Sequence, residues 1–161
     1  MYTPKEFEKV RAIIDDLGTC MFVTTHGIKL KSRPMQTVKV DEDGHIWFFT
    51  ERDSETVAEL ATGFQVNLSY ACTEKNTYLS ISGTAVMIEN QDKIDELWSP
   101  VLKAWFPKGK EDHNLVLLRI APVSAAYWDA TSSKLVELFN IGKAIATGEK
   151  YESGEMAQMK I

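Results

Sequence analysis

The sequence predicts a mainly β domain, a barrel or a sandwich, with helices at its periphery. Short β-rich runs recur at even spacing and are joined by hairpin turns, without the strand–helix alternation of βαβ folds. The length of 161 residues favours one domain, and a hydrophobic share of 44% is enough for a core. We therefore expect one domain over residues 1–147 and a flexible polar tail over 148–161.

Each element follows from its local pattern. Pro34 donates no N–H, which places its strand at an edge or a bulge, and Gly83 indicates a bulge or a close approach of another backbone. Val57 and Leu60 are expected on the inner face of their helix. The predicted strands cover residues 19–25, 32–40, 45–50, 64–72, 77–88 and 114–128. The predicted helices cover 3–17, with a cap at Thr3, then 53–61, 90–98, 101–106 and a last one from Ser132 or Ser133.

Composition narrows the class of partner. The net charge of -5 comes without a concentrated basic face, so we expect no nucleic-acid partner. The N-terminal stretch has no apolar core of a signal peptide, and no run approaches a membrane span, so we expect no membrane partner. Cys20 and Cys72 lie in apolar strand-like runs and are expected to be buried free thiols. A cytoplasmic location follows from these expectations.

The sequence carries no catalytic or metal-binding signature. There is no nucleophile elbow, phosphate-binding loop, zinc-binding spacing or dinucleotide glycine fingerprint. The three histidines are scattered, and His45 beside a turn is expected to be a surface residue without a partner. If the protein catalyses a reaction, a bound cofactor is expected to supply the chemistry.

The candidate binding site lies between Ser32 and Val57. Arg33 can bind a phosphate, and the start of the following helix offers backbone N–H groups and the hydroxyls of Ser54 and Thr56. Met35 and the strand segment 48–50 can form a flat wall for a planar ring. These patterns suit a flat, phosphorylated ligand. The alternative is that Arg33 is a solvated strand charge and that Trp47, Phe48 and Phe49 are core residues.

Three acidic residues argue against phosphate binding at this site. Glu51, Asp53 and Glu55 crowd the predicted phosphate end, and like charges lower the affinity for an anion unless they point away or are offset. Arg52 is either such an offset or a surface residue, and Lys31 is a further candidate for it.

Several segments together resemble a known family. SRPMQTV, IWFFTERDS, YLSISGTAVM and AWFPKGKEDHNLVLLRIAPVSAAYWD are similar to the general stress protein 26 family. This family is a branch of the pyridoxamine 5'-phosphate oxidase-like FMN-binding split β-barrels, and the resemblance covers nearly all of residues 1–147. It implies a six-stranded antiparallel split β-barrel that forms a homodimer, with FMN held at the subunit interface.

The resemblance also implies residue roles. Thr56 stands where the family often has a lysine, a departure that concerns the affinity for FMN. The C-terminal arginine and histidine of the true pyridoxamine phosphate oxidases have no counterpart, so no vitamin B6 oxidation is expected. Trp105 and Trp128 have an alternative reading as interface or core aromatics. The implied FMN contacts are Arg33 and Ser54 to the phosphate, Pro34, Met35, Phe49 and Thr50 to the ring, and Trp105 and Trp128 from the partner chain.

We therefore expect a dimeric FMN-binding protein of the general stress type, a flavin-dependent oxidoreductase that uses NAD(P)H, with NAD(P)H or a small molecule as its substrate. A flavin-binding or stress-sensing module without turnover is the alternative of a different class. A third alternative is a split barrel that binds haem or a deazaflavin.

Overall fold

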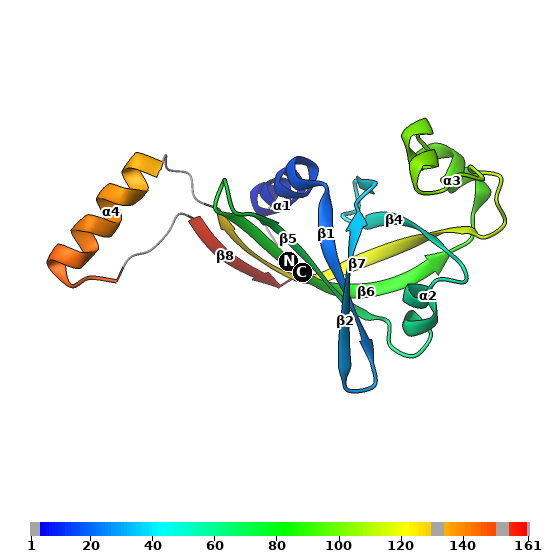
Figure 1. The fold of residues 1–161 in the computed structure, drawn as a ribbon, viewed down its shortest axis with the longest axis horizontal. Helices are drawn as coiled ribbons and strands as arrows, with labels where there is room; N and C mark the ends of the chain where they lie inside the picture. The colour runs from blue at the N-terminus through cyan, green and yellow to red at the C-terminus, as the bar shows by residue number, and fades with distance from the viewer. Residues whose placement is uncertain (1–3, 130–133, 151–154, 161) are drawn as a thin grey trace.

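One antiparallel sheet forms the framework of the molecule (Figure 1). The computed structural model describes residues 4–129, 134–150 and 155–160. The sheet has eight strands in the order β2-β1-β5-β6-β7-β4-β3, with β8 paired to β7. The strands are β1 Thr19–His26, β2 Lys29–Gln36, β3 Lys39–Val40, β4 Ile46–Glu51, β5 Gln65–Cys72, β6 Thr77–Ile88, β7 Leu115–Asp129 and β8 Glu155–Lys160. The helices are α1 Pro4–Leu17, α2 Glu55–Leu60, α3 Gln91–Leu97, the 3-10 helix η1 Pro100–Ala104 and α4 Lys134–Thr147.

The two ends of the sheet are joined by the chain itself. β2 and β3 are the end strands, yet only Thr37 and Val38 separate them, and the Val38 N–H donates to the Trp47 carbonyl over 2.8 Å. β2 and β3 therefore act as one bent strand that closes the sheet toward a barrel, which protects its edges. The predicted class is confirmed. The predicted strand 32–40 is interrupted at residues 37–38, and β8 is an addition to the predicted strands.

The barrel interior and an outer cluster share strand β4. Phe22 and Phe48 meet edge to face inside, with ring centroids 5.3 Å apart, and α1 covers this core with Ile14. The other face of β4 carries Trp47 and Phe49, which pack beneath α3 and η1. All residues from Ile46 to Thr50 are therefore buried, as expected for a strand covered on both faces.

Two expectations from single residues are confirmed. Pro34 lies in β2, an end strand of the sheet, where it pairs with Met21. Gly83 lies at a shift of register between β6 and β7, and a Cβ at this position would lie 2.6 Å from the Ala121 carbonyl oxygen. Only glycine allows the two backbones to approach so closely.

The C-terminal segment corrects one prediction. A tail without secondary structure was expected over 148–161, but Glu155–Lys160 forms β8 and pairs with β7 between Ser124 and Asp129. An edge of β7 offers unpaired N–H and C=O groups, so this segment can bind there through backbone pairing. The expected cap at Thr3 and the expected helix start at Ser132 or Ser133 lie outside the described residues.

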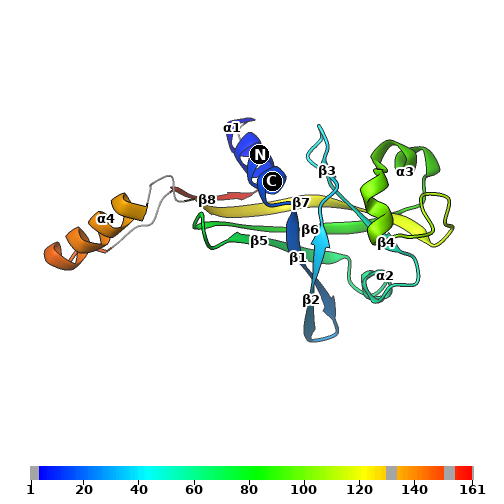
Figure 2. The ribbon, with the colours of Figure 1, turned by 45° about the horizontal axis from the view of Figure 1, so that its top comes forward.

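Helix α4 stands apart from the rest of the molecule. Figures 1 and 2 both show it beyond the ends of β7 and β8, away from the sheet. Across the described ranges, no helix has both the length and the apolar character needed to span a membrane.

Candidate functional site

Strand β2 presents alternate side chains to the interior. Lys31, Arg33 and Met35 are partly buried, whereas Ser32 and Pro34 are exposed, as the two-residue period of a strand requires. Met35 packs against the main core. The two cations Lys31 and Arg33 lie nearer the hairpin end of β2 and are bonded to α2.

The guanidinium of Arg33 is held by two partners from other elements. Its Nη2 donates to Glu59 Oε2 over 2.7 Å, and its Nη1 donates to Thr24 Oγ1 over 2.8 Å. The Thr24 hydroxyl also donates to the same Glu59 oxygen. Glu59 is 2% exposed and Arg33 21%, so this is a largely buried ion pair and not a solvated strand charge. Arginine carries five N–H donors, and these bonds leave others free to bind an anion.

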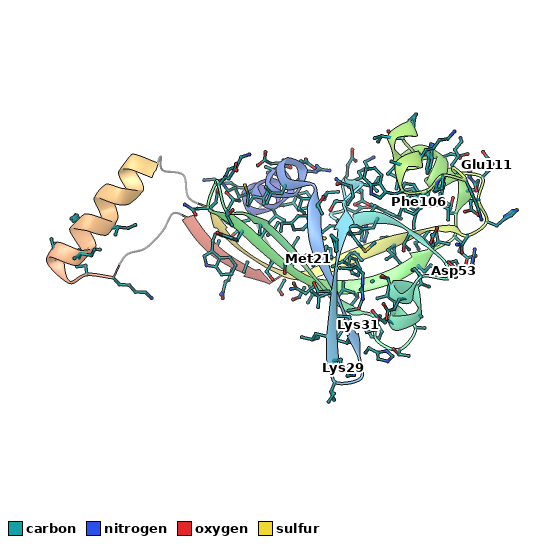
Figure 3. All side chains as sticks on the ribbon, in the orientation of Figure 1. Met21, Lys29, Lys31, Asp53, Phe106 and Glu111 are labelled. Carbon is teal, nitrogen blue, oxygen red and sulfur yellow. The ribbon has the colours of Figure 1, made fainter. Side chains whose placement is uncertain are left out.

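Lys31 joins the same carboxylate from the solvent side. Its ammonium lies 3.1 Å from Glu59 Oε1 and also contacts Glu55, a residue of the first turn of α2. Figure 3 shows Lys31 on β2, on the part of the molecule that carries α2. We call Lys31, Arg33, Glu55 and Glu59 the β2–α2 charge cluster. Two cations and two anions make it formally neutral.

The cluster shifts the pKa values of Glu59 and Lys31 in opposite directions. Burial raises the pKa of Glu59, but hydrogen bonds from Thr24, Lys31 and Arg33 lower it more, and the net direction is down. Hydrogen bonds to Glu55 and Glu59 raise the pKa of Lys31. Both shifts favour the charged forms of Glu59 and Lys31.

Ser54 is the cap residue of α2, the helix predicted over residues 53–61. Its hydroxyl accepts from the Val57 N–H over 3.3 Å and lies 3.2 Å from Thr50 Oγ1, which brings the ends of β4 and α2 together. Helix α2 has only six residues, so its dipole adds little to anion binding. Val57 and Leu60 pack against the core as expected, but Thr56 and Glu59 are the buried residues of this helix.

One of the three acidic residues predicted to crowd this site, Asp53, is engaged elsewhere. Asp53 accepts from Asn114 Nδ2 over 2.9 Å, and Arg52 pairs with Glu89 and with the His113 carbonyl oxygen. Arg52 is therefore a surface residue that faces away from the cluster. Glu55 remains at the site, neutralised by Lys31.

An apolar hollow of about 160 Å³ lies beside the far half of β2. Phe49 forms part of its wall and is itself fixed by Trp98 and Phe106, with ring centroids 5.8 and 6.1 Å away. Figure 3 places Phe106 beside α3. The apolar hollow is lined by Pro34, Met35, Gln36, Val38, Phe49, Leu102, Trp105 and Phe106.

The two predicted tryptophans lie in different places. Trp105 follows η1, is 62% exposed and lines the apolar hollow of its own chain. Its approach to the flavin from the partner chain stays a prediction. Trp128 pairs with Tyr78 near the end of β7. Phe49 pairs with Leu117, about eleven residues earlier in β7, which corresponds to roughly 35 Å of strand. Trp128 is therefore remote from the apolar hollow within one chain.

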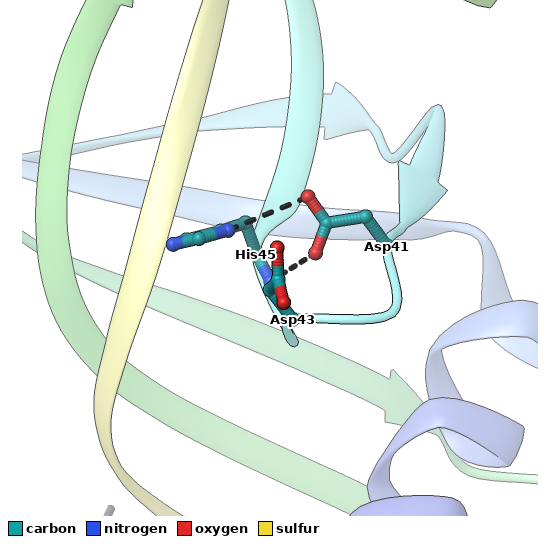
Figure 4. Close-up of side chains that lie close together, drawn as sticks. All are labelled: Asp41, Asp43 and His45. Carbon is teal, nitrogen blue, oxygen red and sulfur yellow. Dashed lines mark hydrogen bonds and ion pairs between the residues drawn. The ribbon is translucent and has the colours of Figure 1, made fainter.

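A separate group of side chains occupies the β3–β4 turn (Figure 4). Asp41 accepts from Trp47 Nε1 and from the His45 N–H, both over 2.8 Å, and its Oδ2 lies 3.4 Å from His45 Nδ1. Burial raises the pKa of Asp41, but the bonds from Trp47 and His45 lower it more. His45 thus has a partner that the sequence did not reveal. Asp43 lies close by. The carboxylate oxygens of Asp41 and Asp43 and the ring nitrogen of His45, which are potential metal ligands, lie within 4.8 Å of one another. The hydrogen bonds of Asp41 account for this arrangement as a stabilised turn.

Sequence reasoning missed Glu59 and Thr24. Glu59 follows Thr56 by three residues and so lies on the same side of α2, which is the one available signal. A glutamate on the inner side of a helix predicts a buried ion pair only when the strand that faces the helix is known. The sequence predicts Lys31 only as a possible offset to nearby acids, whereas the structure places it in the cluster.

Comparisons with known proteins agree with this architecture. The family model described as pyridoxamine 5'-phosphate oxidase like matches residues 5–152. The chain belongs to this family.

Solved structures of similar fold support the assignment. A structure from Jannaschia sp. CCS1 has a TM-score of 0.79 at 24% identity, and the match covers 99% of this chain and 100% of the other. General stress protein 26 from Bacillus anthracis matches with a TM-score of 0.68 and 25% identity over 76% of this chain and 92% of its own. The general stress FMN/FAD binding protein from Xanthomonas citri matches with a TM-score of 0.70 and 32% identity over 81% and 93%. The fold is thus that of the split-barrel proteins of this family.

Proposed function

We propose that this protein binds FMN in the apolar hollow, with its phosphate directed toward the β2–α2 charge cluster. The observation that carries the proposal is the arrangement on one strand: β2 supplies two cations at one end and a wall of the apolar hollow at the other. A planar apolar ring with an anionic tail fits both parts. The FMN/FAD-binding relative from Xanthomonas citri supports the same ligand class.

The residues have separate roles in this proposal. Arg33 contacts the phosphate with the donors that Glu59 and Thr24 leave free, and Ser54 adds a hydroxyl. Pro34, Met35 and Phe49 pack on the ring, and Trp105 covers it from the rim. Thr56 is only 5% exposed, which makes it the weakest of the proposed contacts.

The proposed protein is a homodimer with FMN at the subunit interface. Ligand sites usually have about 300–1,000 Å³, so the apolar hollow of about 160 Å³ is part of a site that a second chain completes. Trp128 is then free to reach the apolar hollow of the partner. A larger groove of about 390 Å³ along β1, β5 and β6 includes the exposed Leu30 and Val123 and is a suitable surface for the contact. The free thiols Cys20 and Cys72 agree with a cytoplasmic location.

The proposed activity is flavin-dependent oxidoreduction with NAD(P)H. FMN supplies the redox chemistry when bound, and the chain contributes binding, orientation and exclusion of water. None of the residues that line the apolar hollow in the described part of the chain is titratable. A lining without titratable groups is equally consistent with a second candidate function, a flavin-binding or stress-sensing module without turnover.

Purification and spectroscopy test the proposal. We expect a yellow protein with absorbance near ~450 nm, as for bound flavins in general. Extraction of the ligand and its spectrum distinguish FMN from haem or a deazaflavin. Consumption of NADH or NADPH by the flavin-loaded protein distinguishes the oxidoreductase from the module.

An arginine variant supplies the matched control. Arg33→Lys is expected to lower FMN affinity while keeping a positive charge beside Glu59, and Lys29→Gln at the exposed start of β2 should leave it unchanged. A colourless protein that binds no added FMN would contradict the proposal.

A further inference from the structure

Two ion pairs of the β2–α2 charge cluster differ sharply in burial. Glu59 is 2% exposed and its partner Arg33 21%, whereas Glu55 is 67% exposed and its partner Lys31 37%. Removing one partner of a buried pair leaves an uncompensated charge, so the Arg33–Glu59 contact is fixed. An exposed pair contributes little and is easily exchanged. The contact between Lys31 and Glu55 is therefore the one that a ligand can replace.

The geometry places the exchangeable cation next to the fixed one. Lys31 and Arg33 are two residues apart on β2, on the same side of the strand, and both contact the Glu59 carboxylate through different oxygens. A phosphate that accepts hydrogen bonds from Arg33 thus lies within the range of the Lys31 ammonium. It also lies near the Glu55 carboxylate, which repels it.

We propose that Lys31 is a second phosphate-binding residue and that Glu55 competes with the ligand for it. This inference rests on the proposed binding of FMN. When a phosphate monoester arrives, Lys31 exchanges its exposed partner Glu55 for the phosphate and keeps its contact with Glu59. Together, Lys31 and Arg33 make the site selective for phosphorylated flavins, while Glu55 lowers the affinity for them.

Riboflavin separates the phosphate contact from the ring contact, because it has the ring of FMN and no phosphate. Flavin fluorescence titrations would give the dissociation constants of FMN and riboflavin for the wild type and the variants. We expect Lys31→Gln to weaken FMN binding about tenfold, the range of one charge-assisted hydrogen bond, and to leave riboflavin binding within about twofold. We expect Glu55→Gln to strengthen FMN binding a few fold, about two to five, because a repelling charge is removed.

The double variant tests the competition itself. In a Lys31→Gln background the gain from Glu55→Gln should shrink, since the two residues no longer exchange partners, although removal of direct repulsion persists. Lys29→Gln, an exposed lysine of the same strand, is the matched control and should change neither constant. Equal weakening of FMN and riboflavin by Lys31→Gln would indicate a structural role and overturn the inference.

Failure of the inference is distinguishable from failure of the proposed function. If the wild type binds FMN and the variants leave the ratio of the two constants unchanged, Lys31 is not a phosphate ligand and only this inference is overturned. If the wild type binds neither flavin, the proposed function is overturned as well. Thermal unfolding of Lys31→Gln and Glu55→Gln checks that both fold, and the exposure of both side chains predicts that they do.

Discussion

Replacement of Glu59 by glutamine tests whether a buried charge stabilises the fold. Glu59 is 2% exposed and contacts Arg33 over 2.7 Å and Lys31 over 3.1 Å. Glutamine has nearly the same shape, but its amide cannot balance two cations, and one end would present N–H groups to the guanidinium. Loss of one partner of a buried ion pair costs about 3–5 kcal/mol. Because Arg33 is 21% and Lys31 37% exposed, both can turn to water, and we expect about 3 kcal/mol.

The expected loss is large enough to measure. Near 150–250 residues, 1 kcal/mol corresponds to roughly 2–4 °C in Tm, so Glu59→Gln should lower Tm by about 6–12 °C. Urea unfolding at fixed protein concentration would give the change in free energy directly. Glu89→Gln is the control, because Glu89 is 49% exposed, pairs with Arg52 and should matter by less than about 1 kcal/mol.

The pH dependence distinguishes charge from packing. The pKa of Glu59 is lowered in the folded protein, so its contribution is present above the unfolded carboxyl pKa of about 4.3 and is lost as the pH falls through the lower folded value. The difference between wild type and Glu59→Gln should therefore be full at pH 7 and shrink as the pH falls below about 4. An equal difference at pH 3 and pH 7, or a difference below about 0.5 kcal/mol at pH 7, would refute the electrostatic explanation.

Three further predictions concern the frame. Gly83→Ala should destabilise the protein by about 1–3 kcal/mol in urea unfolding, because its Cβ would lie 2.6 Å from the Ala121 carbonyl oxygen; an unchanged midpoint would exclude the close approach. Burial raises the pKa of the Cys20 thiol to about 12, so alkylation of the native protein at pH 8 should modify the half-buried Cys72 and spare Cys20, as peptide mass mapping would reveal. Truncation after Lys150 removes β8, and amides of Ser124–Asp129 that face it should exchange faster; unchanged protection would argue against the pairing.

Much of the frame follows from local signals in the sequence. The glycine at position 83 predicted the irregular pairing, and the proline at position 34 predicted an end strand, because each residue restricts the backbone wherever it occurs. The Ser54 cap is likewise local, since its side chain accepts from the Val57 N–H three residues ahead.

The charge cluster depends on contacts between distant residues. Glu59 in a short helix resembles a surface residue until β2 is placed opposite it, and the pairing joins residues far apart in the sequence. Strand β8 was missed for a different reason. Its six residues carry no clear core pattern in the sequence, and the strand pairs with β7 through its backbone, with Ala157 packed against the core.

The central position of β7 has a consequence for synthesis on the ribosome. β7 pairs with β4, β6 and β8, yet it begins only at Leu115. The nascent chain therefore carries β4, with its run of apolar residues from Ile46 to Phe49, long before the partner strand exists. Such long-range pairing slows folding and leaves apolar surface open to chaperones in the meantime. The moment at which this protein becomes folded is set by the emergence of its last third.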